Sequence, residues 1–160
     1  MMRREMRRKD RLVTDRGWID AVLNEAETLE LGMVGADGWP YVVPLGFGYD
    51  GTSIYFHGAA QGKKVDILAA NPKVCFQIYL DAEVERSEVG NDFDVKFRSL
   101  TGYGTITVLT GIDEKSAALA VLMKHYDGPH DPLGENHERV WVARLDIEHM
   151  TGKYYAGRGD

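Results

Sequence analysis

The chain has one cysteine, Cys75, among its 160 residues. A single thiol excludes an intrachain disulfide and a multi-cysteine metal cage, and its place in the apolar run KVCFQIYL predicts a buried structural thiol. Apolar runs of about 20 residues, the length of a transmembrane helix, are absent. The basic start MMRREMRRKDR leads into a polar turn, so no secretory signal is expected. These absences predict a globular, cytoplasmic protein without a membrane partner.

Charge is spread unevenly along the chain. The formal net charge is −6, from 19 Lys and Arg against 25 Asp and Glu, and such an acidic body disfavours binding to nucleic acid. Six basic residues nevertheless lie within the first eleven positions: Arg3, Arg4, Arg7, Arg8, Lys9 and Arg11. We expect residues 1–13 to form a solvated basic arm and residues 14–160 to form a single domain.

Hydrophobic periodicity predicts three helices, at about 14–26, 62–70 and 113–125. Apolar alternation and turn dipeptides predict six strands. Three of them lie in LELGMVGADGWPYVVPLGFGYDGTSIYFHG, divided at Asp37-Gly38 and Asp50-Gly51, and one each in KVCFQIYL, VKFRSLTGYGTITVLT and VWVARLDIEHM. The acidic stretch from Asp81 to Asp94 follows neither period, so we expect a long loop there.

Long strands joined mostly by hairpins favour a mainly β fold, an antiparallel six-stranded barrel with flanking helices, over a doubly wound parallel sheet. Gly102 or Gly104 can bend a long strand and so help to close the barrel. Pro44 lies within a strand but cannot donate a ladder hydrogen bond. We therefore expect an edge, a bulge or a ligand beside its nitrogen.

The segment GAAQGKK joins the strand SIYFHG to a helix and is the best candidate for a binding site. Unpaired N–H groups and the helix dipole attract an anion to such a start, and Gly58 and Gly62 allow a ligand to approach the backbone. Lys63 and Lys64 add two cations at the positive end of the helix. They either point into solvent or bind a phosphate that the protein does not itself supply.

Three stretches together resemble the nitroimidazole reductase branch of the pyridoxamine 5'-phosphate oxidase-like split barrels. They are RRKDR, YVVPLGFGYDGTSIYFHGAAQGKKVDILAANPKVCFQI and FRSLTGYGTI. The resemblance implies a six-stranded FMN-binding split barrel and a homodimer with FMN in each interface groove. It also implies an FMN-dependent oxidoreductase that takes electrons from NAD(P)H and reduces a small acceptor, such as a nitroaromatic compound.

The same resemblance implies roles for individual residues. Lys63 matches the ligand of the FMN phosphate, and His57 matches the histidine that faces flavin and substrate, the candidate catalytic residue. The strand past the flavin ring corresponds to Val43, Pro44 and Leu45. The remaining candidate cofactor contacts are Phe56, Gly58, Lys64, Arg98 and Ser99. Tyr41 and Gly46 stand where the vitamin B6 oxidases have arginine and lysine, which weakens a vitamin B6 assignment.

Other interpretations stay open at this point. His57 can be a structural histidine on the polar face of its strand, and the chain can bind or sense flavin without turnover. The same groove can also hold a deazaflavin or a haem. No metal is expected, because the spacing of His125, His130 and His137 matches no standard zinc pattern.

Overall fold

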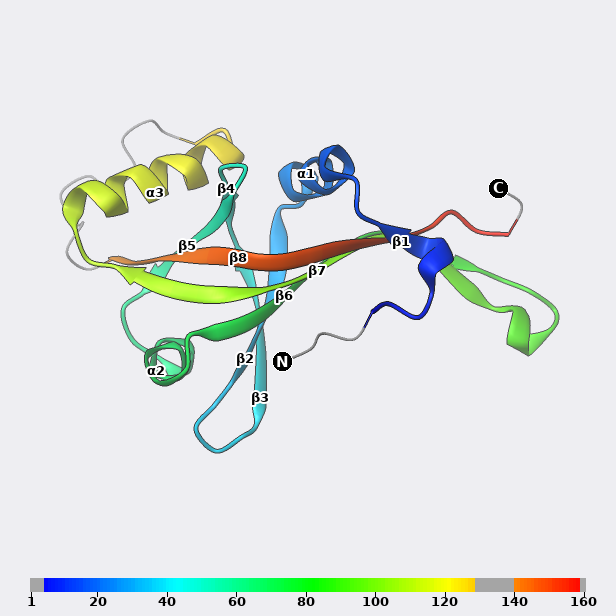
Figure 1. Ribbon diagram of the computed structural model, residues 1–160, viewed down its shortest axis with the longest axis horizontal. Coiled ribbons are helices and arrows are strands. Elements are labelled where there is room, and N and C mark those ends of the chain that lie inside the picture. Colours follow the sequence, from blue (N-terminus) through cyan, green and yellow to red (C-terminus); the bar gives the residue numbers. More distant parts are fainter. Residues whose placement is uncertain (1–4, 129–139, 159–160) are drawn as a thin grey trace.

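The computed structural model describes residues 5–128 and 140–158. Within them, eight strands form one antiparallel sheet in the order β3-β2-β6-β7-β8-β5-β4, with β1 paired to β8 (Figure 1). The strands are β1 (Leu12–Val13), β2 (Thr28–Val34), β3 (Pro40–Gly46), β4 (Gly48–Tyr49), β5 (Ser53–Ala59), β6 (Lys73–Glu85), β7 (Asp94–Leu109) and β8 (Val140–Tyr155). The helices are α1 (Arg16–Glu25), α2 (Lys63–Ala70) and α3 (Ile112–His125). The predicted mainly β, antiparallel barrel fold with flanking helices is confirmed.

The sheet has eight strands rather than the six that were predicted. The two additional strands, β1 and β4, are two residues long, too short for an alternating pattern to reveal. β1 forms only through pairing of Leu12 and Val13 with β8, and β4 only through pairing with β5. Long-range pairing therefore creates both elements.

The barrel core lies on the inner face of the sheet. Ile54 and Phe56 point into it from β5, and Leu29 and Leu31 point into it from β2; all four are fully buried. Burying such side chains stabilises the fold by about 1.5–3 kcal/mol each. A second, smaller cluster joins α3 to the outer face of β8, where Val142 packs against the helix. The first part of β8, from Trp141 to Ala143, is thus buried on both faces.

The glycines of the long strand β7 lie at close contacts with both neighbouring strands. The register of β7 with β8 shifts between Tyr103 and Gly104, and the extra residue of this bulge is Glu148 on β8. A Cβ on Gly102 would lie 2.2 Å from ring atoms of Phe76, and one on Gly104 would lie 2.2 Å from the carbonyl oxygen of Asp146. The absence of side chains at both positions allows the strands to approach this closely.

The predicted loop from Asp81 to Asp94 is shorter than expected, because strands extend into both of its ends. Strand β6 continues to Glu85, and a bulge between Leu80 and Glu83 interrupts the alternation, so the sequence shows no period there. Beyond the bulge, Glu83 lies opposite Lys96 as an oppositely charged cross-strand pair. The connection is confined to residues 86–93, which include the short 3-10 helix Gly90–Asp92.

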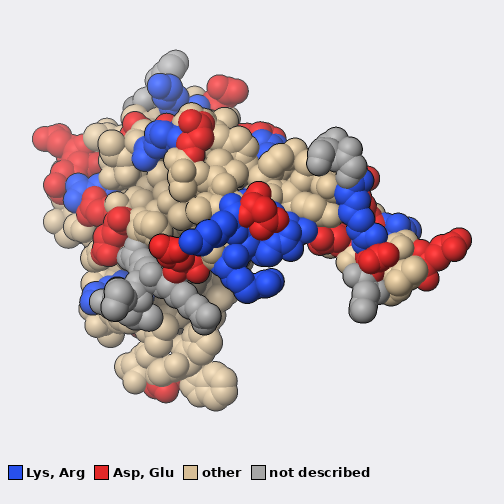
Figure 2. Space-filling model, turned by 45° about the vertical axis from the view of Figure 1, so that its right-hand side comes forward, with Lys and Arg blue, Asp and Glu red and all other residues tan. Residues whose placement is uncertain are grey.

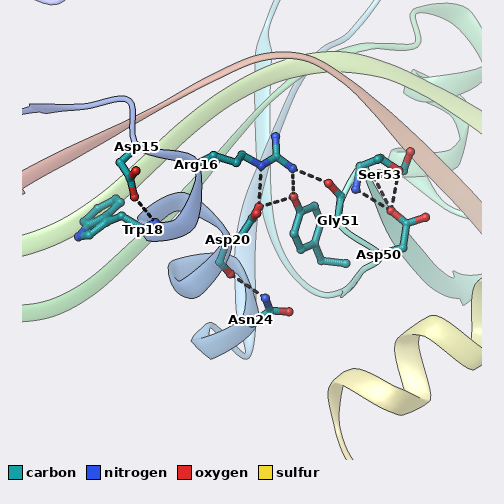
Figure 3. A network of polar contacts seen from close by, with 10 residues as sticks. Asp15, Arg16, Trp18, Asp20, Asn24, Asp50, Gly51 and Ser53 are labelled. Carbon is teal, nitrogen blue, oxygen red and sulfur yellow. Dashed lines mark hydrogen bonds and ion pairs between the residues drawn. The ribbon is translucent and has the colours of Figure 1, made fainter.

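Helix α1 is tied to the turn between β4 and β5 by a polar network (Figure 3). The Tyr49 hydroxyl donates to Asp20 Oδ1 at 2.7 Å, and Arg16 donates to Asp20, to the Tyr49 oxygen and to the Gly51 carbonyl. Burial, with the carboxylate of Asp20, raises the pKa of Tyr49 above its ordinary value. The helix start is capped by Asp15, whose carboxylate accepts from the Trp18 N–H at 2.8 Å.

The end of the N-terminal arm is attached to the sheet instead of being solvated. Residues Lys9–Arg11 form a 3-10 helix ahead of β1. Arg11 forms an ion pair of 2.8 Å with Asp94, and its guanidinium lies 3.5 Å from the centre of the Tyr155 ring. These contacts hold Arg11 against the sheet because they compensate its charge. Lys and Arg side chains are interspersed with Asp and Glu over the face shown in Figure 2.

Cys75 is half-buried, whereas a buried thiol was predicted. Phe76 points into the core from the same strand, so its neighbour Cys75 lies on the outer face, opposite Gly32 and Tyr103. No helix in residues 5–128 and 140–158 is long and apolar enough to cross a membrane.

Candidate functional site

The connection from β5 to α2 builds the start of the helix with a backbone that only glycine adopts readily. Gly62 has φ 120° and ψ 168°, and its carbonyl accepts from the N–H groups of Val65 and Asp66 at 2.9 and 3.2 Å. A side chain at this φ would be strained. Gly62 is therefore the residue that turns the chain from the strand into the helix.

No side chain caps helix α2, in contrast to α1 with its Asp15 cap. The N–H groups of Lys63 and Lys64 belong to the first turn, where backbone donors have no partner within the helix. The positive end of the helix dipole lies at the same place. This helix start thus presents backbone donors and positive potential with no side-chain cap, although Asp66 lies in the same turn.

Two aromatic rings support the lysines of this turn. Lys63 Nζ lies 4.6 Å from the centre of the Tyr41 ring, and Lys64 Nζ lies 4.8 Å from the centre of the Trp141 ring. Among the described residues, no ion pair involves either lysine. Burial lowers the pKa of Lys64 below its ordinary value. Both cations are held by rings and lack an anion, which is the electrostatic arrangement that a phosphate group would complete.

Strand β3 leads away from this cation pair along a free sheet edge. It pairs with β2 alone in the sheet order, so the expectation of an edge at Pro44 is confirmed. The side chains of Tyr41, Val43 and Leu45 pack against the barrel core, whereas Pro44 is exposed. At Val43–Leu45 a ligand would therefore meet the backbone edge and the Pro44 ring.

His57 and Gly58 are neighbours on β5 but face opposite sides. Gly58 lies on the side of the sheet that Phe56 occupies, and a Cβ there would lie 3.4 Å from Lys64 Nζ. Phe56 itself is fully buried in the core and offers a ligand no ring surface. His57 is exposed on the other side of the strand. Its predicted catalytic role stays a prediction, and within one chain its side chain points away from Lys64.

Arg98 and Ser99 lie far from the lysines in the same chain. Arg98 is opposite Tyr154 on β8, whereas Gly58 beside Lys64 is opposite Trp141, thirteen residues earlier on that strand. At about 3.3 Å per residue, this is roughly 40 Å of strand. Arg98 donates to Glu25 and to Asp81, and these carboxylates raise its pKa. The nearly buried Ser99 donates to the carbonyl of Lys153.

Sequence reasoning missed the rings under the lysines. Neither Tyr41 nor Trp141 was predicted to contact these lysines. Both are distant from α2 in the sequence, so no local period connects them with it. His125 Nε2 donates to the Ala26 carbonyl at 2.8 Å, and His130 and His137 lie outside the described residues.

A family model described as pyridoxamine 5'-phosphate oxidase matches residues 15–154. The chain belongs to this family. Among curated proteins, none matches the chain.

Solved structures show the same fold. A candidate 5-nitroimidazole antibiotic resistance protein from Bacteroides thetaiotaomicron is 26% identical with a TM-score of 0.77, and the match covers 89% of this chain and 85% of that one. The flavocytochrome Anf3 from Azotobacter vinelandii has 20% identity and a TM-score of 0.82, with 96% and 73% covered. The FAD and heme binding protein from Mycobacterium smegmatis has 22% identity and a TM-score of 0.82, with 94% and 76% covered.

Proposed function

We propose that this protein is an FMN-dependent oxidoreductase that passes electrons from NAD(P)H to a small, nitro-bearing aromatic acceptor. The observation that carries the proposal is the uncapped start of α2, with Lys63 and Lys64 beside it and no carboxylate paired to either among the described residues. The similarity to the Bacteroides nitroimidazole resistance protein supports the choice of acceptor.

The residues of this chain divide the work of holding the cofactor. Lys63 and the N–H groups of the first turn of α2 bind the phosphate, and the Tyr41 ring holds the Lys63 ammonium in place. The free edge of β3 at Val43–Leu45 orients the flavin ring through backbone groups. Bound FMN supplies the electron-transfer chemistry, which no side chain of this site could provide.

We further propose a homodimer in which the groove is shared by two chains. Because Arg98 and Ser99 are separated from Lys63 along the sheet, and His57 faces away from Lys64, these residues can meet one flavin only if the partner chain supplies them. The outer face of the sheet carries exposed apolar side chains in one row, with Val42 at 60% exposure and Tyr103 at 40%. Burial of this row would stabilise the dimer.

A visible absorption spectrum combined with anaerobic reduction tests the enzymatic proposal. Protein purified or reconstituted with FMN should be yellow, and NADH or NADPH should bleach the flavin band. A nitroaromatic acceptor added afterwards should restore it. Flavin that stays oxidised with both donors would indicate a flavin-binding module that does not turn over. Protein that never takes up FMN would contradict the proposal altogether.

The mass of the FMN-bound protein in solution tests the dimer. Sedimentation equilibrium should give twice the 17.9 kDa chain mass, and Val42→Glu should lower this mass because it places a charge in the proposed interface. Phe93→Ala, a change outside the Val42 row, serves as the control. A monomer that binds one FMN with full affinity would contradict the shared groove.

A further inference from the structure

A cleft of about 300 Å³ lies between the β2–β3 turn and α2, next to the proposed phosphate position. Its walls include Gly35, Asp37 and Trp39 from the turn and Lys63, Asp66 and Ile67 from the helix. The volume is at the lower end of the range for small-molecule sites. The cleft therefore suits a single ring system with its attached sugar better than a whole cofactor.

The turn that forms one wall is held by its own hydrogen bonds. Gly35 N–H donates to the Trp39 carbonyl at 3.0 Å, and Gly38 N–H donates to the Gly35 carbonyl at 2.9 Å. Asp37 Oδ1 accepts from the Trp39 N–H at 3.0 Å. Trp39 is 74% exposed on this ordered turn and lines the cleft. An indole presented in this way offers a face on which a heteroaromatic ring can stack.

The order of Trp39, Tyr41 and Val43–Leu45 along the chain indicates which kind of ligand would carry such a ring. Lys63 Nζ lies over Tyr41, Trp39 precedes Tyr41 by two residues, and Val43–Leu45 follows it. The phosphate position thus lies between the proposed flavin edge and the Trp39 cleft. A ligand that spans this line needs a ring on each side of its phosphates, which is the chemical order of a dinucleotide.

We propose that the cleft binds the adenosine half of a dinucleotide, with the adenine stacked on Trp39 and the pyrophosphate at Lys63. The assignment rests on the proposed function in one respect, the use of Lys63 as a phosphate ligand. The cleft itself, its indole and its two carboxylates are independent of that role.

The carboxylates determine which adenosine fits. Asp37 and Asp66 both line the cleft and carry negative charge at neutral pH. A carboxylate accepts hydrogen bonds from ribose hydroxyls but repels a 2'-phosphate, the distinction that separates NAD from NADP in other nucleotide sites. We therefore assign the cleft to an adenosine without a 2'-phosphate, the adenosine that FAD carries.

Calorimetric titration with ADP tests the assignment on the protein as purified and after loading with FMN. ADP should bind, and adenosine 2',5'-bisphosphate should bind about tenfold more weakly because of the two carboxylates. Asp66→Asn should reduce the difference in affinity between ADP and adenosine 2',5'-bisphosphate. Trp39→Ala should weaken ADP binding by about tenfold, which is in the lower part of the range for removal of an aromatic ring that stacks on a base. Phe93→Ala, an exposed aromatic at the opposite end of the sheet, should leave ADP binding unchanged.

A comparison of FAD with FMN tests whether the flavin supplies this adenosine. FAD should bind more tightly than FMN, and Trp39→Ala should remove the difference. Equal binding of FAD and FMN by the wild type would overturn the assignment.

Failure to bind ADP below about millimolar concentration, or equal binding by the Trp39→Ala variant, would overturn it. The two proposals fail separately. FMN binding without ADP binding removes the cleft assignment alone, and ADP binding without FMN binding removes the proposed flavin function alone.

Discussion

The Lys64 ammonium lies 4.8 Å from the centre of the Trp141 ring, where burial lowers its pKa and no carboxylate pairs with it among the described residues. The folded protein therefore holds a partly dehydrated cation with only a ring for compensation. Such an arrangement costs stability unless a ligand completes it. The relationship between these two residues links the stability of the domain to its binding site.

Lys64→Met should stabilise the protein without ligand and weaken FMN binding. The folded-state pKa of Lys64 lies below its ordinary value of 10.5, so between these two values the unfolded chain binds more protons. The free energy of unfolding of the wild type should thus rise with pH in that window, relative to the variant. Urea denaturation of both proteins between neutral pH and pH 10 measures this difference. A variant that is less stable at neutral pH would contradict the account.

Gly62→Ala should destabilise the domain and disturb the phosphate site together. Its φ of 120° is strained for any residue with a side chain, and the expected loss is about 1–3 kcal/mol in the free energy of unfolding. Gly90→Ala is the matched control, because it has no neighbouring atom within 4 Å and no positive φ. Denaturant midpoints compare the two. Equal effects would show that the backbone at Gly62 has no special requirement.

Tyr55 should make the wild type sensitive to strongly alkaline pH. Burial, with the hydrogen bond of 2.7 Å to Asp50, raises the pKa of Tyr55 to about 12 from the ordinary value of 10.0. Between these values the unfolded chain loses the proton that the folded protein keeps, so the free energy of unfolding falls as pH rises. The free energy of unfolding of the Tyr55→Phe variant should fall less steeply from pH 10 to 12. Parallel curves for the two proteins would contradict this prediction.

Local sequence patterns predicted those elements whose structure is determined by residues close together in the chain. Apolar alternation and the dipeptide Asp50-Gly51 predicted the strand β5, and hydrophobic periodicity predicted helix α3. Elements that depend on distant partners were not predictable in this way. β1 exists only because β8 pairs with it, and the bulge after Leu80 concealed the end of β6.

The candidate site was predictable in part for the same reason. Lys63, Lys64 and the start of α2 are contiguous and carry a local signal. The rings of Tyr41 and Trp141 reach the lysines only through the folded barrel. Arg98 was placed in the site by resemblance, and its ion pairs with Glu25 and Asp81 locate it elsewhere in the chain.

Comparing FMN with riboflavin, which lacks the phosphate, tests the central claim most directly. Fluorescence titrations of the wild type should show much tighter binding of FMN than of riboflavin. Lys63→Ala should weaken FMN binding by about tenfold or more and leave the affinity for riboflavin unchanged. Lys124→Ala, an exposed lysine on α3, should behave as the wild type. A Lys63→Ala variant that keeps the full preference for FMN over riboflavin would place the phosphate elsewhere and contradict the account.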